Sequence, residues 1–264
     1  MDQNNEHFNK PIDISELLAA LQSCKSKSPG PESTKLLTKE QCGFRRNHST
    51  LDALTSLHTD ICSAFRRNHH LITIALDITN AYDTVWKKRV LTILHLRKIN
   101  GNLLKFIKNF LADRTFSVKV NDKTSSTHTI ENELPQGSIL SVTLFLVAIN
   151  NICNNLPKPA KFILFADDCI IYCSRSQIIT TTLFLQQALD SLARWSSETG
   201  LSFSSTKTQC IVFIKKKKDP LPILNLMNTQ FPFANSIRIV GLIFDHKLTW
   251  RPHLKIKNGM PIKN

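Results

Sequence analysis

Apolar residues recur along the chain with two different spacings. Apolar positions three and four residues apart, the spacing of one helix face, predict helices over residues 14–21, 51–65, 84–96, 103–111, 140–152 and 181–196. Short apolar or β-branched runs predict strands over residues 71–76, 116–120, 127–130, 162–165, 169–173, 210–214 and 237–244. Because strands and helices interleave throughout, the pattern predicts an α/β or α+β domain with a partly antiparallel sheet.

Capping and turn residues mark the ends of several of these elements. Ser49 or Thr50 can cap the helix that follows them, and Asp83 is expected to cap the next predicted helix. Asn121-Asp122 indicates a hairpin turn, because Asn and Asp tolerate tight-turn backbone conformations. Gly200 is expected to end the last predicted helix as its C-cap.

The composition changes between residues 23 and 40, where Lys, Ser, Pro and Thr dominate and Pro29-Gly30-Pro31 excludes a helix. We therefore expect an N-terminal helix and linker at 1–40 and a main domain at 41–264. The N-terminus is polar and acidic, so no signal peptide is expected. The most apolar stretch, residues 139–152, is too short to span a membrane.

The acidic side chains fall at positions that suggest chemistry. Asp77 ends one predicted strand, and Asp167-Asp168 join two strongly apolar strands. Carboxylates gathered beside a core repel one another and need a cation, and hard oxygen ligands suit Mg²⁺ or Mn²⁺. Two such ions can clamp an in-line phosphoryl transfer. The alternative is structural, since Asp-Asp is also an ordinary hairpin-turn sequence and an Asp at a strand end is often a loop residue.

Charge points toward a polyanionic partner. The sequence holds 34 Lys and Arg against 20 Asp and Glu, so the net charge is 34 − 20 = +14, with a pI near 9.6. Nucleic acid is the simplest such partner, an acidic membrane surface is weaker, and a merely solvated basic surface stays open. Seven cysteines without a CxxC pair indicate reduced thiols in an intracellular protein, whether nuclear or cytoplasmic.

Six segments in order resemble the reverse transcriptases of non-LTR (LINE-like, jockey-type) retrotransposons. Phe165-Ala166-Asp167-Asp168 resembles the Phe/Tyr-x-Asp-Asp motif, and residues 75–85 resemble the first catalytic motif of that branch. The others are the Gly-Phe-Arg block at 41–50, the Gln-Gly motif at 134–141, Thr206-Lys207-Thr208, and residues 241–250. Together they cover residue 41 to about residue 253.

The resemblance implies a right-hand polymerase palm with partial fingers, built on an antiparallel-rich sheet flanked by helices. It also implies an RNA-directed DNA polymerase, a nucleotidyltransferase that joins dNTPs to a DNA primer on an RNA template. By the same resemblance Asp77 and Asp167 would bind both metal ions, Asp168 would complete the set, and the Ile78 carbonyl would take one coordination position.

The remaining roles also come from the resemblance. Tyr82 would be the steric gate against a ribose 2′-hydroxyl, and Gln136 and Gly137 would line the nucleotide pocket. Lys207 would protonate the leaving pyrophosphate. Residues implied to contact nucleic acid are Arg45 and Arg46 on the template side and Gly241, supported by Trp250, at the primer grip. Each role has a structural alternative. Tyr82 and Trp250 could be core residues, and Gln136-Gly137 could be an ordinary turn. Lys207 could face solvent, and the arginines could form a basic surface.

The chain also departs from the family. Lys27 to Glu32 resembles a block that lies far upstream in the family, yet only Ser33 to Glu40 separates it from the Gly-Phe-Arg block. A fingers segment is therefore expected to be deleted, and no thumb or endonuclease domain is expected. Val142 stands where the family has Pro. A second hypothesis follows, a catalytically inactive retroelement remnant that at most binds nucleic acid.

Overall fold

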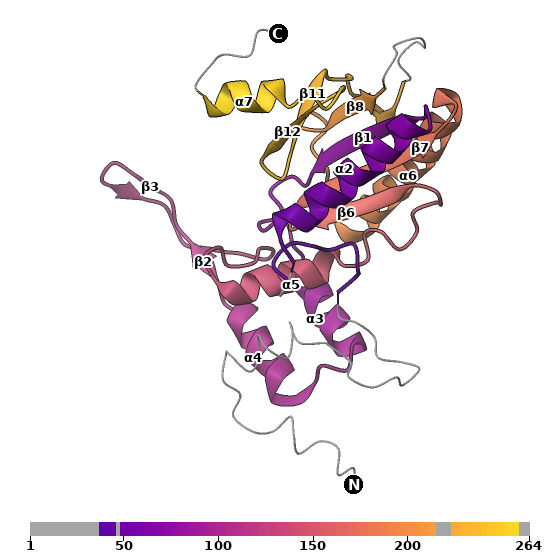
Figure 1. The fold of residues 1–264 in the computed structure, drawn as a ribbon. Helices are drawn as coiled ribbons and strands as arrows, with labels where there is room; N and C mark the ends of the chain where they lie inside the picture. Colours follow the sequence, from indigo (N-terminus) through magenta and orange to yellow (C-terminus); the bar gives the residue numbers. More distant parts are fainter. Residues whose placement is uncertain (1–36, 46–47, 215–222, 259–264) are drawn as a thin grey trace. The chain divides into compact units, whose positions relative to one another are not determined.

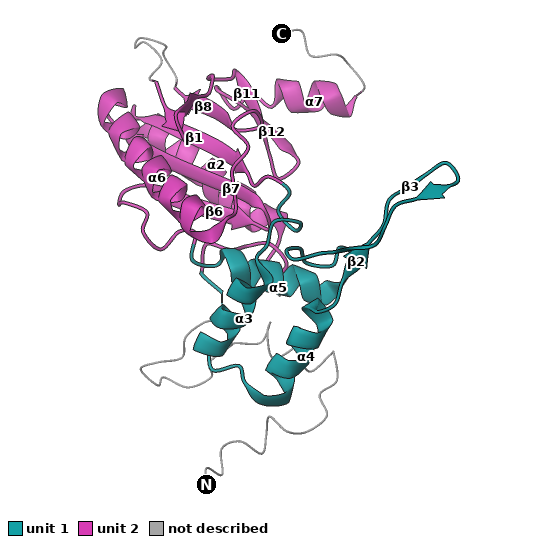
Figure 2. Ribbon diagram, turned by 180° about the vertical axis from the view of Figure 1, so that it is seen from behind, with its two compact units in different colours: residues 1–38, 80–151 teal, residues 39–79, 152–264 magenta. Residues whose placement is uncertain are grey.

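The computed structural model describes residues 37–45, 48–214 and 223–258 of the 264-residue chain. The chain divides into two compact units, coloured separately in Figure 2. Unit 1 holds residues 1–38 and 80–151, and unit 2 holds residues 39–79 and 152–264. The predicted helix at 14–21 and Arg46 lie outside the described residues.

Unit 2 is built on a four-stranded sheet in the order β6–β7–β1–β8 (Figure 1). The strands are β6 (Lys161–Phe165), β7 (Asp168–Arg175), β1 (His70–Asp77) and β8 (Gln209–Phe213). All three pairings are antiparallel, which confirms the predicted antiparallel sheet. Short parallel bridges lie at both edges, Gln41 with Leu164 on β6 and Phe233 with Cys210 on β8.

Two helices cover the two faces of this sheet. Figure 1 shows α2 (Thr50–Arg66) in front of the sheet, and Figure 2, seen from behind, shows α6 (Ile178–Thr199) in front. Leu57 and Ile61 of α2 join one core cluster with alternate strand residues such as Ile170. Ser49 and Asp52 form a capping box before α2, and Gly200 ends α6 with φ +76°, so both predicted caps are confirmed.

A second, smaller hairpin packs against the α2 face of the sheet. It consists of β11 (Ser236–Ile239) and β12 (Leu242–Asp245), and Ile237 and Phe244 join the α2 cluster. A single strand at 237–244 was predicted, which is wrong because Val240 and Gly241 have φ of 45° and 83° and reverse the chain. Unit 2 also contains β9 (Asn225–Leu226), β10 (Thr229–Gln230) and α7 (Arg251–Lys257).

Unit 1 contains three helices and an exposed ribbon. The helices are α3 (Lys87–Leu96), α4 (Gly101–Leu111) and α5 (Ile139–Ile149), and α5 is buried along most of its length. The ribbon, which Figure 2 shows extending away from these helices, pairs β2 (Thr115–Phe116) with β5 (His128–Thr129) and β3 (Lys119–Val120) with β4 (Lys123–Thr124). This pairing confirms the predicted hairpin at Asn121-Asp122.

Asp83 is not the cap of α3. The backbone N–H groups of Asp83 and Thr84 donate to the Asn80 carbonyl at 2.9 and 3.1 Å, so a turn occupies this segment. The helix begins only at Lys87, after Trp86. The predicted start of this helix, at residue 84, is therefore three residues too early, because a polar residue before a helical pattern also fits a helix cap.

Two further expectations concern cysteines and membranes. The six cysteines among the described residues are free thiols. Burial raises the pKa of the Cys169 and Cys210 thiols well above their ordinary value, which favours the protonated thiol. Among the described residues, no helix combines the length and the apolar character needed to cross a bilayer.

Candidate active site

Asp77 and Asp168 lie directly opposite each other in the sheet. Asp77 is the last residue of β1, Asp168 is the first residue of β7, and the antiparallel register pairs them. Residues paired in this way have Cα atoms about 4.5–5.5 Å apart and side chains on the same face. Asp167 sits next to them, in the two-residue turn closed by Phe165 and Asp168. The predicted placement at adjacent strand ends is therefore confirmed for Asp77 and Asp168, with Asp167 beside Asp168 in the connecting turn.

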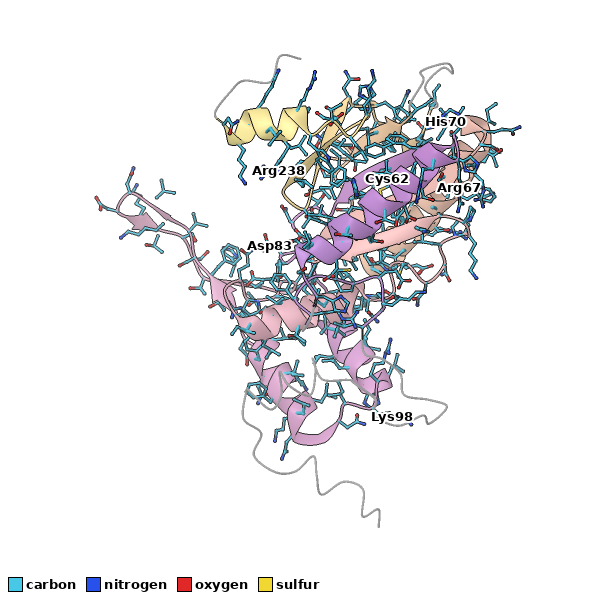
Figure 3. All side chains as sticks on the ribbon, viewed as in Figure 1. Cys62, Arg67, His70, Asp83, Lys98 and Arg238 are labelled. Carbon is cyan, nitrogen blue, oxygen red and sulfur yellow. The ribbon has the colours of Figure 1, made fainter. Side chains whose placement is uncertain are left out.

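The three acids influence one another electrostatically. Burial of its carboxyl raises the pKa of Asp168, and the negative charges of Asp167 and Asp77 raise it further. The charge of Arg238, on β11 and labelled in Figure 3, acts in the opposite direction. A carboxyl that resists ionisation beside two other carboxylates marks a place where added positive charge is stabilising.

Lys207 supplies part of that charge. Its ammonium lies 3.3 Å from Oδ2 of Asp77. The segment that carries Lys207 is attached to the end of β1, because the Ser204 N–H donates to the Asp77 carbonyl at 2.9 Å and the Thr79 N–H donates to the Ser202 carbonyl at 2.8 Å. The buried Ile78 forms a bridge with Phe203 in the same connection, so the backbone after Asp77 is held in place.

The donor chemistry of this site fits a hard dication. Oδ2 of Asp77 is shielded from solvent and receives no hydrogen bond of good geometry, despite the nearby ammonium. Three carboxylates and a backbone carbonyl are the oxygen ligands that Mg²⁺ and Mn²⁺ prefer. Within the described residues, however, no three Asp, Glu, His or Cys side chains are already gathered around one point. The carboxylates would have to draw together to hold an ion.

Tyr82, Gln136 and Gly137 come together in unit 1. With Ser138, Ile139 and Val142 they line a pocket of 330 Å³. The Leu134 N–H donates to the Tyr82 carbonyl at 2.9 Å, which joins the two segments. The Tyr82 ring stacks on Phe145, with centroids 4.7 Å apart and planes 22° apart. One face of the tyrosine is thus fixed by packing, and the residue also lines the pocket.

The turn before α5 is set by Gln136 and Gly137. Nε2 of Gln136 donates to Oδ1 of Asp83 at 2.7 Å, so Asp83, labelled in Figure 3, orients a pocket residue instead of capping a helix. Gly137 has φ +89°, and a Cβ added there would meet no atom within 4 Å. The glycine is therefore required by the backbone conformation and leaves open space on the pocket side.

The predicted nucleic-acid contacts have mixed surroundings. Arg45 is half-buried and donates to the Gln41 carbonyl at 2.9 Å. Gly241 forms the exposed turn between β11 and β12. Trp250 packs against Phe244 and His58, with ring centroids 5.2 and 5.7 Å away. These contacts give Trp250 a structural role beneath the hairpin.

Asp245 holds the segment that leads to Trp250. Its carboxylate accepts hydrogen bonds from the backbone N–H groups of Lys247, Thr249 and Trp250 at 3.1, 3.0 and 2.8 Å. Burial opposes ionisation of this carboxyl, but the backbone N–H donors outweigh it and lower the pKa of Asp245.

Comparison with known proteins decides the family. The model of a family described as reverse transcriptase (RNA-dependent DNA polymerase) matches residues 14–244. The chain belongs to the reverse transcriptase family.

Individual relatives lie in the branch that the motifs indicated. The RNA-directed DNA polymerase from mobile element jockey of Drosophila melanogaster is 27% identical over 244 residues, which cover 90% of this chain and 26% of the relative. The probable RNA-directed DNA polymerase from transposon BS of the same species is 27% identical over 228 residues, which cover 84% of this chain and 25% of the relative. The chain thus spans about a quarter of the length of the curated relatives it matches.

Solved structures with the same fold are also found. Apo telomerase from Candida tropicalis, truncated from its C-terminal domain, is 14% identical with a TM-score of 0.59, over 95% of this chain and 48% of that one. Telomerase from Candida tropicalis in complex with a TWJ fragment of telomeric RNA is 12% identical with the same TM-score of 0.59, over 89% of this chain and 36% of that one. At such identities the likeness concerns the fold, and it confirms the predicted polymerase fold.

Sequence reasoning missed two residues of this candidate site. Arg238 alternates with buried Ile237 and Ile239, which indicates an outward-facing strand residue but not that its charge reaches Asp168. Asp245 was noted only as part of a motif. An acid that ends an apolar run and is followed by polar residues was the available signal for its role.

Proposed function

We propose that this chain is the catalytic part of an RNA-directed DNA polymerase, which adds dNTPs to a DNA primer on an RNA template inside the cell. The observation that carries the proposal is the pairing of Asp77 with Asp168 beside Asp167, in a chain of the reverse transcriptase family.

In this proposal Asp77, Asp167, Asp168 and the Ile78 carbonyl hold Mg²⁺ or Mn²⁺. Ions held there would supply positive charge to the primer hydroxyl and to the reacting phosphate. The raised pKa of Asp168 supports this assignment, because it reflects crowded negative charge that a dication neutralises.

The other residues position the reactants. Gln136 and Gly137 orient the incoming nucleotide, and the Tyr82 ring excludes a ribose 2′-hydroxyl from the pocket. Lys207 holds a proton on Nζ and transfers it to the leaving pyrophosphate oxygen, and its contact with Asp77 supports a place at the reaction centre. Arg45 and Arg46 contact template phosphates, and the Gly241 turn, supported by Trp250, contacts the primer.

A second candidate is a catalytically inactive remnant that binds nucleic acid through its charge of +14. The observation that favours it is the lack, among the described residues, of three metal-binding side chains already gathered at one point.

Primer extension on an RNA template distinguishes the two candidates. The purified chain is compared with Asp167→Asn and with Asp190→Asn, an exposed α6 residue that gives the same change of charge. The polymerase proposal expects dNTP incorporation that is lost in Asp167→Asn and kept in Asp190→Asn. RNA–DNA hybrid binding without incorporation in any of the three proteins would contradict it and favour the remnant.

A further inference from the structure

The turn that carries Asp167 has an unusual backbone. Ala166 and Asp167 form a two-residue connection between β6 and β7, and Ala166 has φ +57°. The first position of such turns with positive φ favours Gly, because a Cβ is crowded in the left-handed region. A non-glycine residue persists there when the surrounding structure over-determines the conformation. Contacts from residues outside the β6–β7 hairpin must therefore stabilise the backbone conformation of Ala166.

Gln41 makes the contacts that hold it. This side chain is 1% exposed, and its Oε1 accepts hydrogen bonds from the Ala166 N–H at 3.2 Å and from the Gly43 N–H at 2.7 Å. Its Nε2 lies 3.5 Å from the Ala166 carbonyl, to which it donates. Both backbone groups of Ala166 thus meet one amide, and two N–H donors on Oε1 fix which way that amide faces.

The segment around Gln41 is itself anchored to the strand that leads into the turn. The Cys42 N–H donates to the Leu164 carbonyl at 2.7 Å, and the Leu164 N–H donates to the Glu40 carbonyl at 3.0 Å. Gly43 then lies against the turn, since a Cβ built on it would be 2.3 Å from the Ala166 nitrogen. No side chain fits at that separation, so Gly43 is required by close packing on the turn.

We infer that Gln41 is a positioning residue for the acidic turn: it fixes the backbone of Ala166 and so aims Asp167 toward the side where Asp77 and Asp168 lie. Gly43 serves the same purpose by letting the segment approach. The turn's geometry is a property of the fold alone, and its consequence for metal binding rests on the proposed function.

Two variants and one control test this inference. Gln41→Met keeps an unbranched side chain of similar size but removes the acceptor and the donor. Gly43→Ala introduces a methyl group against the Ala166 nitrogen. Ser196→Ala is the matched control, because it removes a buried hydrogen bond of 2.6 Å to the Leu201 carbonyl at the end of α6, on the opposite face of the sheet.

Amide hydrogen exchange measures how often the Ala166 amide of the turn opens, and it requires no metal ion. Loss of the Gln41 acceptor should speed exchange of the Ala166 amide by about tenfold, since a hydrogen bond contributes roughly one factor of ten in opening. Ser196→Ala should leave that amide unchanged. Unchanged exchange at Ala166 in Gln41→Met, or equal acceleration in Ser196→Ala, would overturn the inference. Should Gln41→Met not fold, Gly43→Ala decides by the same measurement.

Mn²⁺ titration of the full chain then measures the consequence of the turn geometry for metal affinity. Residues that orient metal ligands typically change affinity by about 10- to 100-fold, so Gln41→Met and Gly43→Ala should weaken Mn²⁺ binding by at least about tenfold. Mn²⁺ affinity equal to that of the unaltered chain, despite faster exchange at Ala166, would overturn the positioning role. If Asp167→Asn leaves Mn²⁺ binding unchanged, it is the proposed function that fails, and the exchange result still stands.

Discussion

Replacing Lys207 by Met separates the stability of the candidate site from its chemistry. The Lys207 side chain is 70% exposed and that of Asp77 is 36% exposed, with 3.3 Å between their charged atoms. Ion pairs of this exposure contribute about 0.2–1 kcal/mol, because water screens them and two side chains lose freedom. The free energy of unfolding in urea should therefore fall by less than about 1 kcal/mol.

The same variant should improve metal binding while it impairs catalysis. Lys207 competes with a dication for Asp77, so removing it should tighten Mn²⁺ binding by up to about fivefold, the equivalent of about 1 kcal/mol. Primer extension should nevertheless fall by about 100-fold or more, because loss of a general acid typically costs that much in rate.

The matched control is Lys161→Met. Lys161 forms an ion pair with Asp60 at 2.8 Å, with its side chain 58% exposed, at the end of β6 away from the acids. It should change neither Mn²⁺ affinity nor extension. Weaker Mn²⁺ binding in Lys207→Met would show that Lys207 does not compete for the metal ligands. Undiminished extension in the variant would show that Lys207 donates no proton.

Four further outcomes are expected. Asp245→Asn should lower the free energy of unfolding by about 2 kcal/mol, because charge-assisted hydrogen bonds from backbone N–H groups are lost. Folding lowers the pKa of Asp245, so its stabilising contribution is present above the ordinary carboxyl pKa and disappears as pH falls through the pKa of the folded state. Urea unfolding at several pH values measures both effects. As pH is lowered, Mn²⁺ affinity should begin to fall at a higher pH than it would for a site of ordinary carboxylates, because the pKa of Asp168 is raised and the protonated acid is a poor ligand. In Asp168→Asn, this part of the pH dependence of Mn²⁺ affinity should be absent. Tyr82→Ala should relax discrimination against ribonucleotides in primer extension, whereas Tyr82→Phe should retain it, and equal discrimination in both would assign Tyr82 to packing on Phe145. Binding to an RNA–DNA hybrid should weaken steeply with salt through counterion release, and a salt-independent affinity would contradict an electrostatic interface.

The sequence was informative wherever a local pattern determines the structure. The apolar runs beside Asp77 and Asp168 define two central strands, and strand alternation then places both acids on one face. The reversal at Val240-Gly241 was missed, because an apolar run that contains one glycine also fits a continuous strand. Asp83 was misassigned, because a helix cap and a partner for a distant amide require the same residue type.

Long-range contacts were beyond the reach of periodicity. The hydrogen bonds between the Gln41 side chain and the Ala166 backbone span 125 residues, and no local pattern around Gln41 indicates them. The glycine two residues later was a hint of close packing, but a single chain does not say against what. The charge of Arg238 reaches Asp168 because the hairpin packs on the α2 face, which is a matter of tertiary structure.

The short bridges at the two edges of the unit 2 sheet bear on how this chain meets other copies of itself. Unpaired edge strands are templates for aggregation, and proteins block them with covering segments, charge or short length. Here Gln41 covers β6 at Leu164, Phe233 covers β8 at Cys210, and Lys161 places a charge at the start of β6. A strand added from a neighbouring molecule would have to displace these segments, and on the β6 side it would displace the residue that contacts the acidic turn.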